Sequence, residues 1–265
     1  MADATALLDD LRDETESLDA LVAPLDAAGF ATPTPAEGWT VAHQISHLAW
    51  TDRWSLLACR EGAEEFQARF TDLLATGDDP VEAGAAEGVG EEPAELLARW
   101  RAGRAELAEA LAEAAASGRQ LPWFGPPMKA PTMATARLME TWAHGQDVAD
   151  ALGVVREPTA RLRHVAHLGV RTMGFAFVLH GLPAPEASVR VELTAPSGEP
   201  WTWGPAEAAD SVRGPALDFC LLVTQRRHRD ELALRVAGPV AEAWLPIAQA
   251  FAGTPGAGRP APQQN

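Results

Sequence analysis

Cysteine is scarce in this sequence of 265 residues, and the two cysteines present, Cys59 and Cys220, lie far apart. Two distant thiols provide neither a disulfide framework nor a cysteine-based zinc site, so we expect a reducing compartment. The sequence also lacks any run of about 18 apolar residues, which a membrane-spanning helix needs. Its first residues are acidic where a signal peptide is basic. These absences predict a cytoplasmic protein that does not span a membrane.

Positive charge is the second shortage. Lys and Arg number 21 against 37 Asp and Glu, which gives a formal net charge of -16. A surface of this sign repels phosphate backbones and anionic lipids, so we expect no nucleic-acid partner and no membrane partner.

Hydrophobic residues make up 47% of the chain, and its length suffices for one large core or two smaller ones. We predict two domains and leave open whether the protein is a monomer or a homodimer.

Helical periodicity dominates the first two thirds of the chain. Leucine and alanine spacing predicts helices over 3–29, 41–62, 91–117, 132–152 and 158–181. Thr40 is the expected N-cap of the second helix. Four prolines and two glycines in segment 118–131 predict a loop without regular structure. The first four helices are expected to form a bundle.

The pattern changes after Gly181. ASVRVELTAP and PWTWG alternate as strands do around the turn PSGE, which predicts a hairpin. ALDFCLLVTQRRHRDEL indicates a helix, ALRVAG a strand and VAEAWLPIAQAFAG a last helix. We therefore predict a mainly α chain in four parts. The parts are a metal-binding four-helix bundle over 1–155, a connecting helix over 156–181, a small α+β domain over 182–253 and a disordered, proline- and glycine-rich tail over 254–265.

The segment ARLMETWAHGQDVADALG, residues 136–153, places Glu140 four residues before His144 and Asp147 three residues further on. Residues four apart on a helix share a face, so Glu140 and His144 can bind one ion. The alternative is a solvated helix face, because an apolar stripe runs along the opposite side, and the pair taken alone favours this alternative. Asp147 is expected to be a hydrogen-bonding neighbour or a surface residue, not a ligand.

Residues of the second helix favour the metal-binding interpretation over the solvated helix face. His47 shares a face with Trp50 and Trp54, and a face with two tryptophans is not expected to lie in water. If that face meets Glu140 and His144, two imidazoles and one carboxylate come together. With one position left to water or substrate, this donor set is typical of a catalytic zinc site, and it also suits iron or nickel.

Two segments resemble a known family. WTVAHQISHLAWTD and METWAHGQDV look like the two metal-binding signatures of the DinB-like superfamily, in particular its mycothiol-dependent maleylpyruvate isomerase branch. The resemblance covers about residues 1–155 by motif and the remainder more loosely. It implies an N-terminal DinB-like four-helix bundle followed by a small α+β domain, and it implies His47, Glu140 and His144 as the metal ligands.

Further candidate site residues come from the fifth helix. His164, His167 and Arg171 lie among apolar residues at helical spacing, so we expect Arg171 and at least one of the two histidines to be buried. One interpretation is a structural network. The other is that His167 and Arg171 are catalytic, by proton transfer and carboxylate binding, and that His164 contacts substrate. Candidate substrate-binding aromatic residues are Trp50, Trp54 and Trp123. For Trp123, simple packing is the alternative.

The predicted function is that of a metal-dependent enzyme for a small organic molecule, with mycothiol or another low-molecular-weight thiol as co-substrate. A divalent metal, with Zn2+ favoured over Ni2+ or Fe2+, would lower the pKa of the thiol and provide thiolate for isomerisation or thiol transfer. A second hypothesis is hydrolysis by metal-activated water. A third is a non-catalytic metal-binding or small-molecule-sensing protein.

Overall fold

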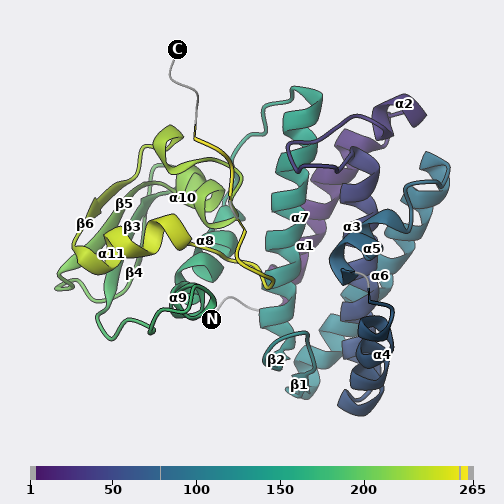
Figure 1. Cartoon of the computed structure of the whole chain (residues 1–265), viewed down its shortest axis with the longest axis horizontal. Coiled ribbons are helices and arrows are strands. Elements are labelled where there is room, and N and C mark those ends of the chain that lie inside the picture. The colour runs from purple at the N-terminus through teal and green to yellow at the C-terminus, as the bar shows by residue number, and fades with distance from the viewer. Residues whose placement is uncertain (1–3, 78, 257, 262–265) are drawn as a thin grey trace. The chain divides into compact units, whose positions relative to one another are not determined.

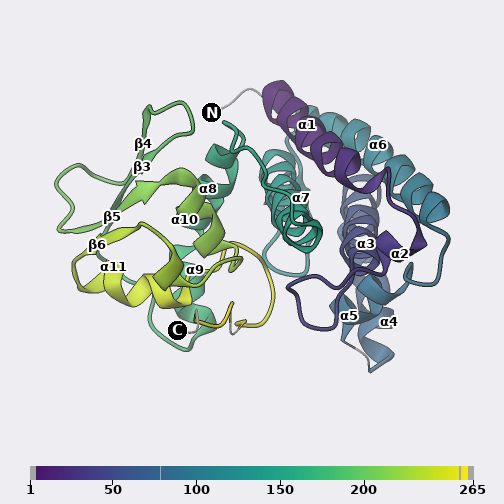
Figure 2. The same ribbon diagram turned by 90° about the horizontal axis from the view of Figure 1, so that it is seen from above.

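The computed structural model describes residues 4–77, 79–256 and 258–261. The chain divides into two compact units, Met1–Arg156 and Glu157–Asn265. Figure 1 and, in a second view, Figure 2 show long helices in the first unit and the larger sheet in the second. The predicted fold class, a mainly α chain with a helical bundle and a small α+β part, is confirmed. Among the described residues, no helix is both long enough and apolar enough to cross a membrane.

Long helices form the core of the first unit (Figure 1). They are α1 (Ala4–Val22), α3 (Val41–Arg60), α6 (Pro93–Ser117) and α7 (Ala130–Leu152). Helix α3 packs against α6 and α7, and α7 packs against α1 as well. Apolar side chains from each of these helices fill the space between them, among them Leu18, Ile45, Trp100 and Val148. The helices that leucine and alanine spacing predicts for this bundle are therefore present.

The first predicted helix is in fact two. Helix α1 ends at Val22, shortly before Pro24, and a short helix α2 (Ala27–Phe30) follows. The residue before a proline avoids the helical region. The Asp26 carboxylate then accepts a hydrogen bond from the Gly29 N–H at 2.9 Å and caps the new helix. The prediction of a single helix is wrong here, because leucine spacing does not reveal the break between α1 and α2.

The segment between α3 and α6, for which the sequence indicates no element, forms α4 (Ala63–Ala75) and α5 (Pro80–Ala86). Asp79 caps α5 by accepting hydrogen bonds from two N–H groups of its first turn, at 2.8 and 3.1 Å. Helix α5 packs on α3 through Gly84, where an added Cβ would lie 2.4 Å from Cδ2 of Trp50. Glycine thus lets the backbone of α5 lie directly on this indole.

A short hairpin occupies part of segment 118–131. Strand β1 (Gln120–Leu121) pairs antiparallel with β2 (Met128–Lys129). The prolines of this segment fall between the strands or after them, where pairing needs no N–H group. The prediction that nothing regular forms here is therefore wrong for these four residues.

A four-stranded sheet organises the described part of the second unit, in the order β4-β3-β5-β6. The strands are β3 (Val189–Thr194), β4 (Pro200–Trp203), β5 (Asp210–Pro215) and β6 (Arg235–Ala237). Strand β3 is antiparallel to β4 and parallel to β5, and β5 is antiparallel to β6. The predicted hairpin β3–β4 and strand β6 are confirmed. Strand β5 is absent from the sequence prediction, because its residues show no apolar alternation.

The helices among the described residues of this unit are shorter than predicted. They are α8 (Leu162–Arg171), α9 (Met173–Leu179), α10 (Ala216–Val223) and α11 (Pro239–Trp244), with 3-10 turns at Arg229–Glu231 and Leu245–Ile247. The break between α8 and α9 falls at Thr172, whose hydroxyl donates to the carbonyl of Leu168 at 3.0 Å, a contact that often bends helices. Helix α10 ends early because Gln225 adopts a left-handed φ of 59°.

The predicted tail begins within the described residues. Residues 254–256 and 258–261 contain no helix and no strand. The remaining part of the predicted disordered tail lies outside the described residues.

Candidate metal centre

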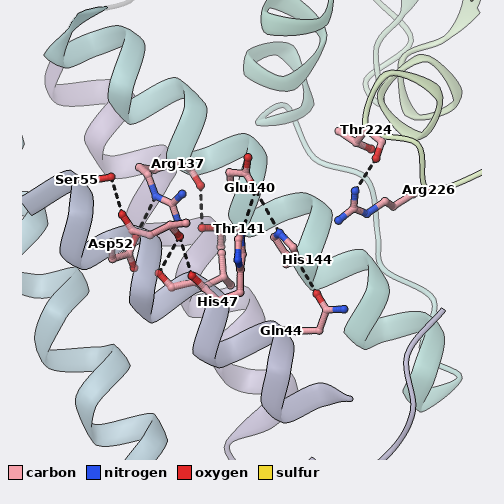
Figure 3. Close-up of polar contacts among 12 residues, drawn as sticks. Gln44, His47, Asp52, Ser55, Arg137, Glu140, Thr141, His144, Thr224 and Arg226 are labelled. Carbon is pink, nitrogen blue, oxygen red and sulfur yellow. Dashed lines mark hydrogen bonds and ion pairs between the residues drawn. The ribbon is translucent and has the colours of Figure 1, made fainter. Parts of the chain in front are cut away.

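His47, Glu140 and His144 converge between two helices of the first unit (Figure 3). His47 comes from α3, whereas Glu140 and His144 come from α7. Oε2 of Glu140 lies 3.2 Å from Nε2 of His144 and 4.0 Å from Nε2 of His47. One ligand atom of each residue lies within 4.8 Å of the other two. The structure thus brings together three residues that are up to 97 positions apart in the sequence.

Burial of α7 on several sides explains why Glu140 and His144 face another helix although an apolar stripe runs along the opposite side. Helix α1 covers one side and α3 another, so most residues of α7 are buried. His47 and His144 are only 6% and 8% exposed. The alternative of a solvated helix face is therefore wrong.

Trp39 forms one wall of the cluster. Its ring stacks on that of His144, with centroids 5.9 Å apart and an interplanar angle of 14°, and its centroid lies 5.3 Å from that of His47. Nε1 of Trp39 donates a hydrogen bond to the Glu82 carboxylate of α5 at 3.0 Å, which holds the ring in place. The sequence prediction missed Trp39. The available signal was an aromatic residue just before the helix that carries His47.

Gln44 is a second residue that the sequence prediction missed. It lies fully buried on α3, and its Oε1 is 2.5 Å from Nδ1 of His144. Its position three residues before His47 is one turn of helix, so both residues share a face. That spacing was a usable signal, because an amide on the face of a candidate metal-binding histidine is placed to contact a second candidate ligand.

Burial alone would raise the pKa of the Glu140 carboxyl, but its neighbours reverse this effect. A hydrogen bond with His144, together with the charges of His144, Arg137 and His47, lowers the pKa to about 2. Glu140 is therefore a carboxylate at neutral pH. The deprotonated carboxylate is the form that binds a metal ion.

A buried ion pair joins the same two helices one turn from Glu140 (Figure 3). Nε of Arg137 on α7 donates to Oδ1 of Asp52 on α3 at 3.0 Å, and both side chains are less than a tenth exposed. Burial raises the pKa of Asp52, while the charge and hydrogen bond of Arg137 act to lower it. The pair fixes α3 against α7 close to the point where His47 faces Glu140.

An aromatic cluster continues from His47 along α3. The ring centroid of Trp50 lies 6.2 Å from that of His47, and Trp50 stacks on Phe124 at 5.9 Å with planes 8° apart. Trp54 and Trp123 also pack against Phe124, with centroids 5.1 and 4.7 Å away. Phe124, in the turn of the β1–β2 hairpin, thus connects the three candidate tryptophans. Trp50 and Trp54 are buried in this packing.

The three converging side chains fit a first-row divalent metal. Ligands about 2 Å from a tetrahedral ion lie about 3.3 Å from one another, and the separations of 3.2 and 4.0 Å are close to that value. Two imidazoles and one carboxylate also leave one position for water or substrate. Asp147 is buried, yet it is not part of any potential metal-binding group among the described residues.

His164, His167 and Arg171 lie on α8, in the second unit. His167 and Arg171 are exposed and His164 is only partly buried, so the expected burial of Arg171 and a histidine is wrong. The reason is that α8 buries its other face, against α10. Nε1 of Trp203 donates to Nδ1 of His167 at 3.2 Å. Desolvation of the covered part of its ring and the nearby positive charges of Arg171, His164 and Arg163 lower the pKa of His167. Catalytic or substrate-binding roles for these residues stay predictions.

The fold and the site together define a class of protein. It is a helical bundle with a candidate metal centre in its core, formed by two histidines and one glutamate from facing helices. The signature described as the mycothiol maleylpyruvate isomerase N-terminal domain matches residues 11–149, and the chain belongs to this family. The signature described as wyosine base formation matches residues 185–235 of the second unit.

Similarity to other proteins extends over nearly the whole chain. Uncharacterized proteins from two strains of Mycobacterium tuberculosis are 54% identical over 263 residues, which is 98% of this chain and 100% of theirs. The crystal structure of a mycothiol-dependent maleylpyruvate isomerase matches with a TM-score of 0.60 and 19% identity, over 90% of this chain and 96% of that one. A histidine-to-alanine mutant of such an isomerase gives 0.59 and 18%, with the same coverage. These structures confirm the fold that the two sequence segments imply.

Proposed function

We propose that this chain is a metal-dependent enzyme that uses a low-molecular-weight thiol of the mycothiol type to isomerise a small organic electrophile or to transfer the thiol to it. The observation that carries the proposal is the convergence of His47, Glu140 and His144 in a chain of this family. In the proposal these three residues hold one divalent ion. Zn2+ is the first candidate, because its usual donors include imidazole and carboxylate, and Ni2+ or Fe2+ are the alternatives.

A metal ion held there would lower the pKa of a thiol bound in the open position. The thiol would then be a thiolate at neutral pH. The chain's own thiols are unsuited to that role. Burial raises the pKa of Cys59 to about 11, and it raises the pKa of Cys220 still further. Both side chains are buried. A reactive sulfur at the centre would therefore have to come from a separate molecule.

The protein side chains around the centre have distinct tasks in this proposal. Glu140 contributes the negative charge that offsets the metal ion. Trp39 covers the rings of His47 and His144 and excludes water from that side. Trp50, next to His47, is the member of the aromatic cluster best placed to contact an apolar part of the substrate.

The direct test combines metal analysis with cobalt substitution. The purified protein should contain one equivalent of a divalent metal, and cobalt-loaded protein titrated with mycothiol should develop a sulfur-to-cobalt charge-transfer band. His47→Ala should lose both the metal and the band. Glu109→Gln, on the exposed surface of α6, is the matched control and should retain both. Retained metal without a sulfur band would contradict the thiol mechanism and favour hydrolysis by metal-activated water.

Activity is tested with maleylpyruvate, the substrate that the name of the structurally similar isomerase provides. We expect turnover that requires both metal and mycothiol. A sulfur band without turnover of maleylpyruvate would exclude that substrate and leave thiol transfer to a different electrophile. Turnover that is unaffected by a chelator and by omission of the thiol would contradict the proposed function.

A further inference from the structure

The two ring nitrogens of His144 have different neighbours. Nδ1 lies 2.5 Å from Oε1 of Gln44, and Nε2 lies 3.2 Å from Oε2 of Glu140. Gln44 is 0% exposed, so water does not compete for the contact with Nδ1. The hydrogen bond at Nδ1 is therefore made to a protein group. Figure 3 shows the imidazole of His144 between these two side chains.

The orientation of the Gln44 amide follows from a chain of hydrogen bonds into the segment before α3. The hydroxyl of Thr34 donates to the backbone carbonyl of Trp39 at 2.9 Å, so its hydrogen is already used. Oγ1 of Thr34 lies 2.9 Å from the amide group of Gln44 and must accept there. The atom of Gln44 that faces Thr34 is therefore the NH2 nitrogen, and the atom that faces His144 is the carbonyl oxygen.

A carbonyl oxygen only accepts hydrogen bonds, so Nδ1 of His144 must carry a proton. In the neutral ring Nε2 then has a free lone pair, and this lone pair faces the ionised Glu140 at 3.2 Å. Two acceptors at this distance repel each other unless a proton or a metal ion lies between them. In the metal-free chain a proton on Nε2 makes the hydrogen bond that lowers the pKa of Glu140, and a metal ion would take its place. The arrangement is suited to a cation shared by His144 and Glu140.

We infer that Gln44 is a positioning residue that fixes His144 as its Nδ1–H tautomer and reserves Nε2 for a cation shared with Glu140. The inference rests on the proposed function only in taking that cation to be a metal ion. A hydrogen-bond partner on the ring nitrogen that faces away from the metal sets the tautomer and the ring orientation of a metal-binding histidine. It follows that residues 34–39, which precede α3, belong to the centre through Thr34 as well as through the stacked ring of Trp39.

The test uses metal-free protein first. Nitrogen-15 NMR of the His144 ring, recorded where the ring is neutral, should show the proton on Nδ1. Gln44→Leu removes the acceptor with little change in size and should move the proton to Nε2, where Glu140 accepts it. Gln44→Glu keeps an acceptor and should keep the Nδ1–H form. Gln67→Leu, at an exposed position of α4, is the control for the substitution itself.

Metal affinity provides the second measurement, by competition with a chelator. Gln44→Leu should weaken binding by about 10- to 100-fold, as loss of such a partner does elsewhere, and Gln44→Glu should restore most of it. If Gln44→Leu does not fold, Thr34→Val takes its place. It leaves Gln44 present but frees its amide to turn, and it should give a mixture of the two tautomers.

Two results would overturn the inference. One is a parent protein whose neutral His144 carries its proton on Nε2, and the other is a tautomer that none of these substitutions changes. Failure of the proposed function looks different. If the parent and Gln44→Glu both bind no metal while the NMR result holds, the metal-dependent function is wrong and the role of Gln44 in fixing the ring stands.

Discussion

Replacement of Glu140 by glutamine should make the metal-free protein less stable, and the loss should depend on pH in a defined direction. The pKa of Glu140 in the folded chain is about 2, below its ordinary value of 4.5. A carboxyl whose pKa is lowered by folding stabilises the folded state fully above its unfolded pKa. This stabilisation is lost as the pH falls from about 4.5 towards about 2.

The magnitude follows from the same two values. Each pH unit between them corresponds to about 1.4 kcal/mol, so the interactions of the ionised carboxylate contribute about 3 kcal/mol to the free energy of unfolding where His144 donates its hydrogen bond to Glu140. Screening by solvent reduces this figure only slightly, because the side chain is 20% exposed. Glutamine has the same shape but no charge, so Glu140→Gln should remove most of this contribution.

The assay is urea unfolding in the presence of a chelator, at several values between about pH 7 and about pH 3. The parent and Glu140→Gln should differ by at most about 3 kcal/mol at pH values above about 4.5 where His144 donates to Glu140, and the difference should shrink steadily below about pH 4.5. Glu109→Gln, on the exposed face of α6, controls for the loss of one negative charge from a chain of net charge -16. A difference that stays constant or grows on acidification would refute the reasoning, as would a variant more stable than the parent at neutral pH.

Two other predictions concern the same pair of helices. His47→Ala should abolish stoichiometric metal binding, whereas Asp147→Ala should weaken it by no more than about 10- to 100-fold. Equilibrium dialysis separates the two cases, and equal losses would contradict the assigned ligands. Arg137→Met leaves the buried Asp52 without its partner and should lower the free energy of unfolding by about 3 to 5 kcal/mol. In urea unfolding the double variant Arg137→Met/Asp52→Leu should recover much of that loss, and a purely additive result would show that the ion pair has no such role.

Local features of the sequence were sufficient to predict most of the bundle and part of the centre. Helical periodicity depends on residues three and four apart, so it can be read without knowledge of the neighbours. The spacing of Glu140 and His144 needs only that a proline-free segment be helical. For His47, the two tryptophans on the same face indicated burial, because such a face is unfavourable in water.

Only the tertiary structure decided which side chains complete the centre. Gln44 reaches His144 across 100 positions of sequence, and the ring of Trp39 is held by Glu82 of a helix that the sequence did not reveal. These contacts depend on how separate helices pack, and no local pattern contains that information. The fifth predicted helix shows the same limit of local patterns, because there they predicted a burial that the structure does not have. Its apolar and polar positions predicted that Arg171 is buried, but the face that α8 buries is set by α10, and Arg171 remains exposed. Periodicity shows that a face is apolar, whereas burial of any one residue depends on the element that covers it.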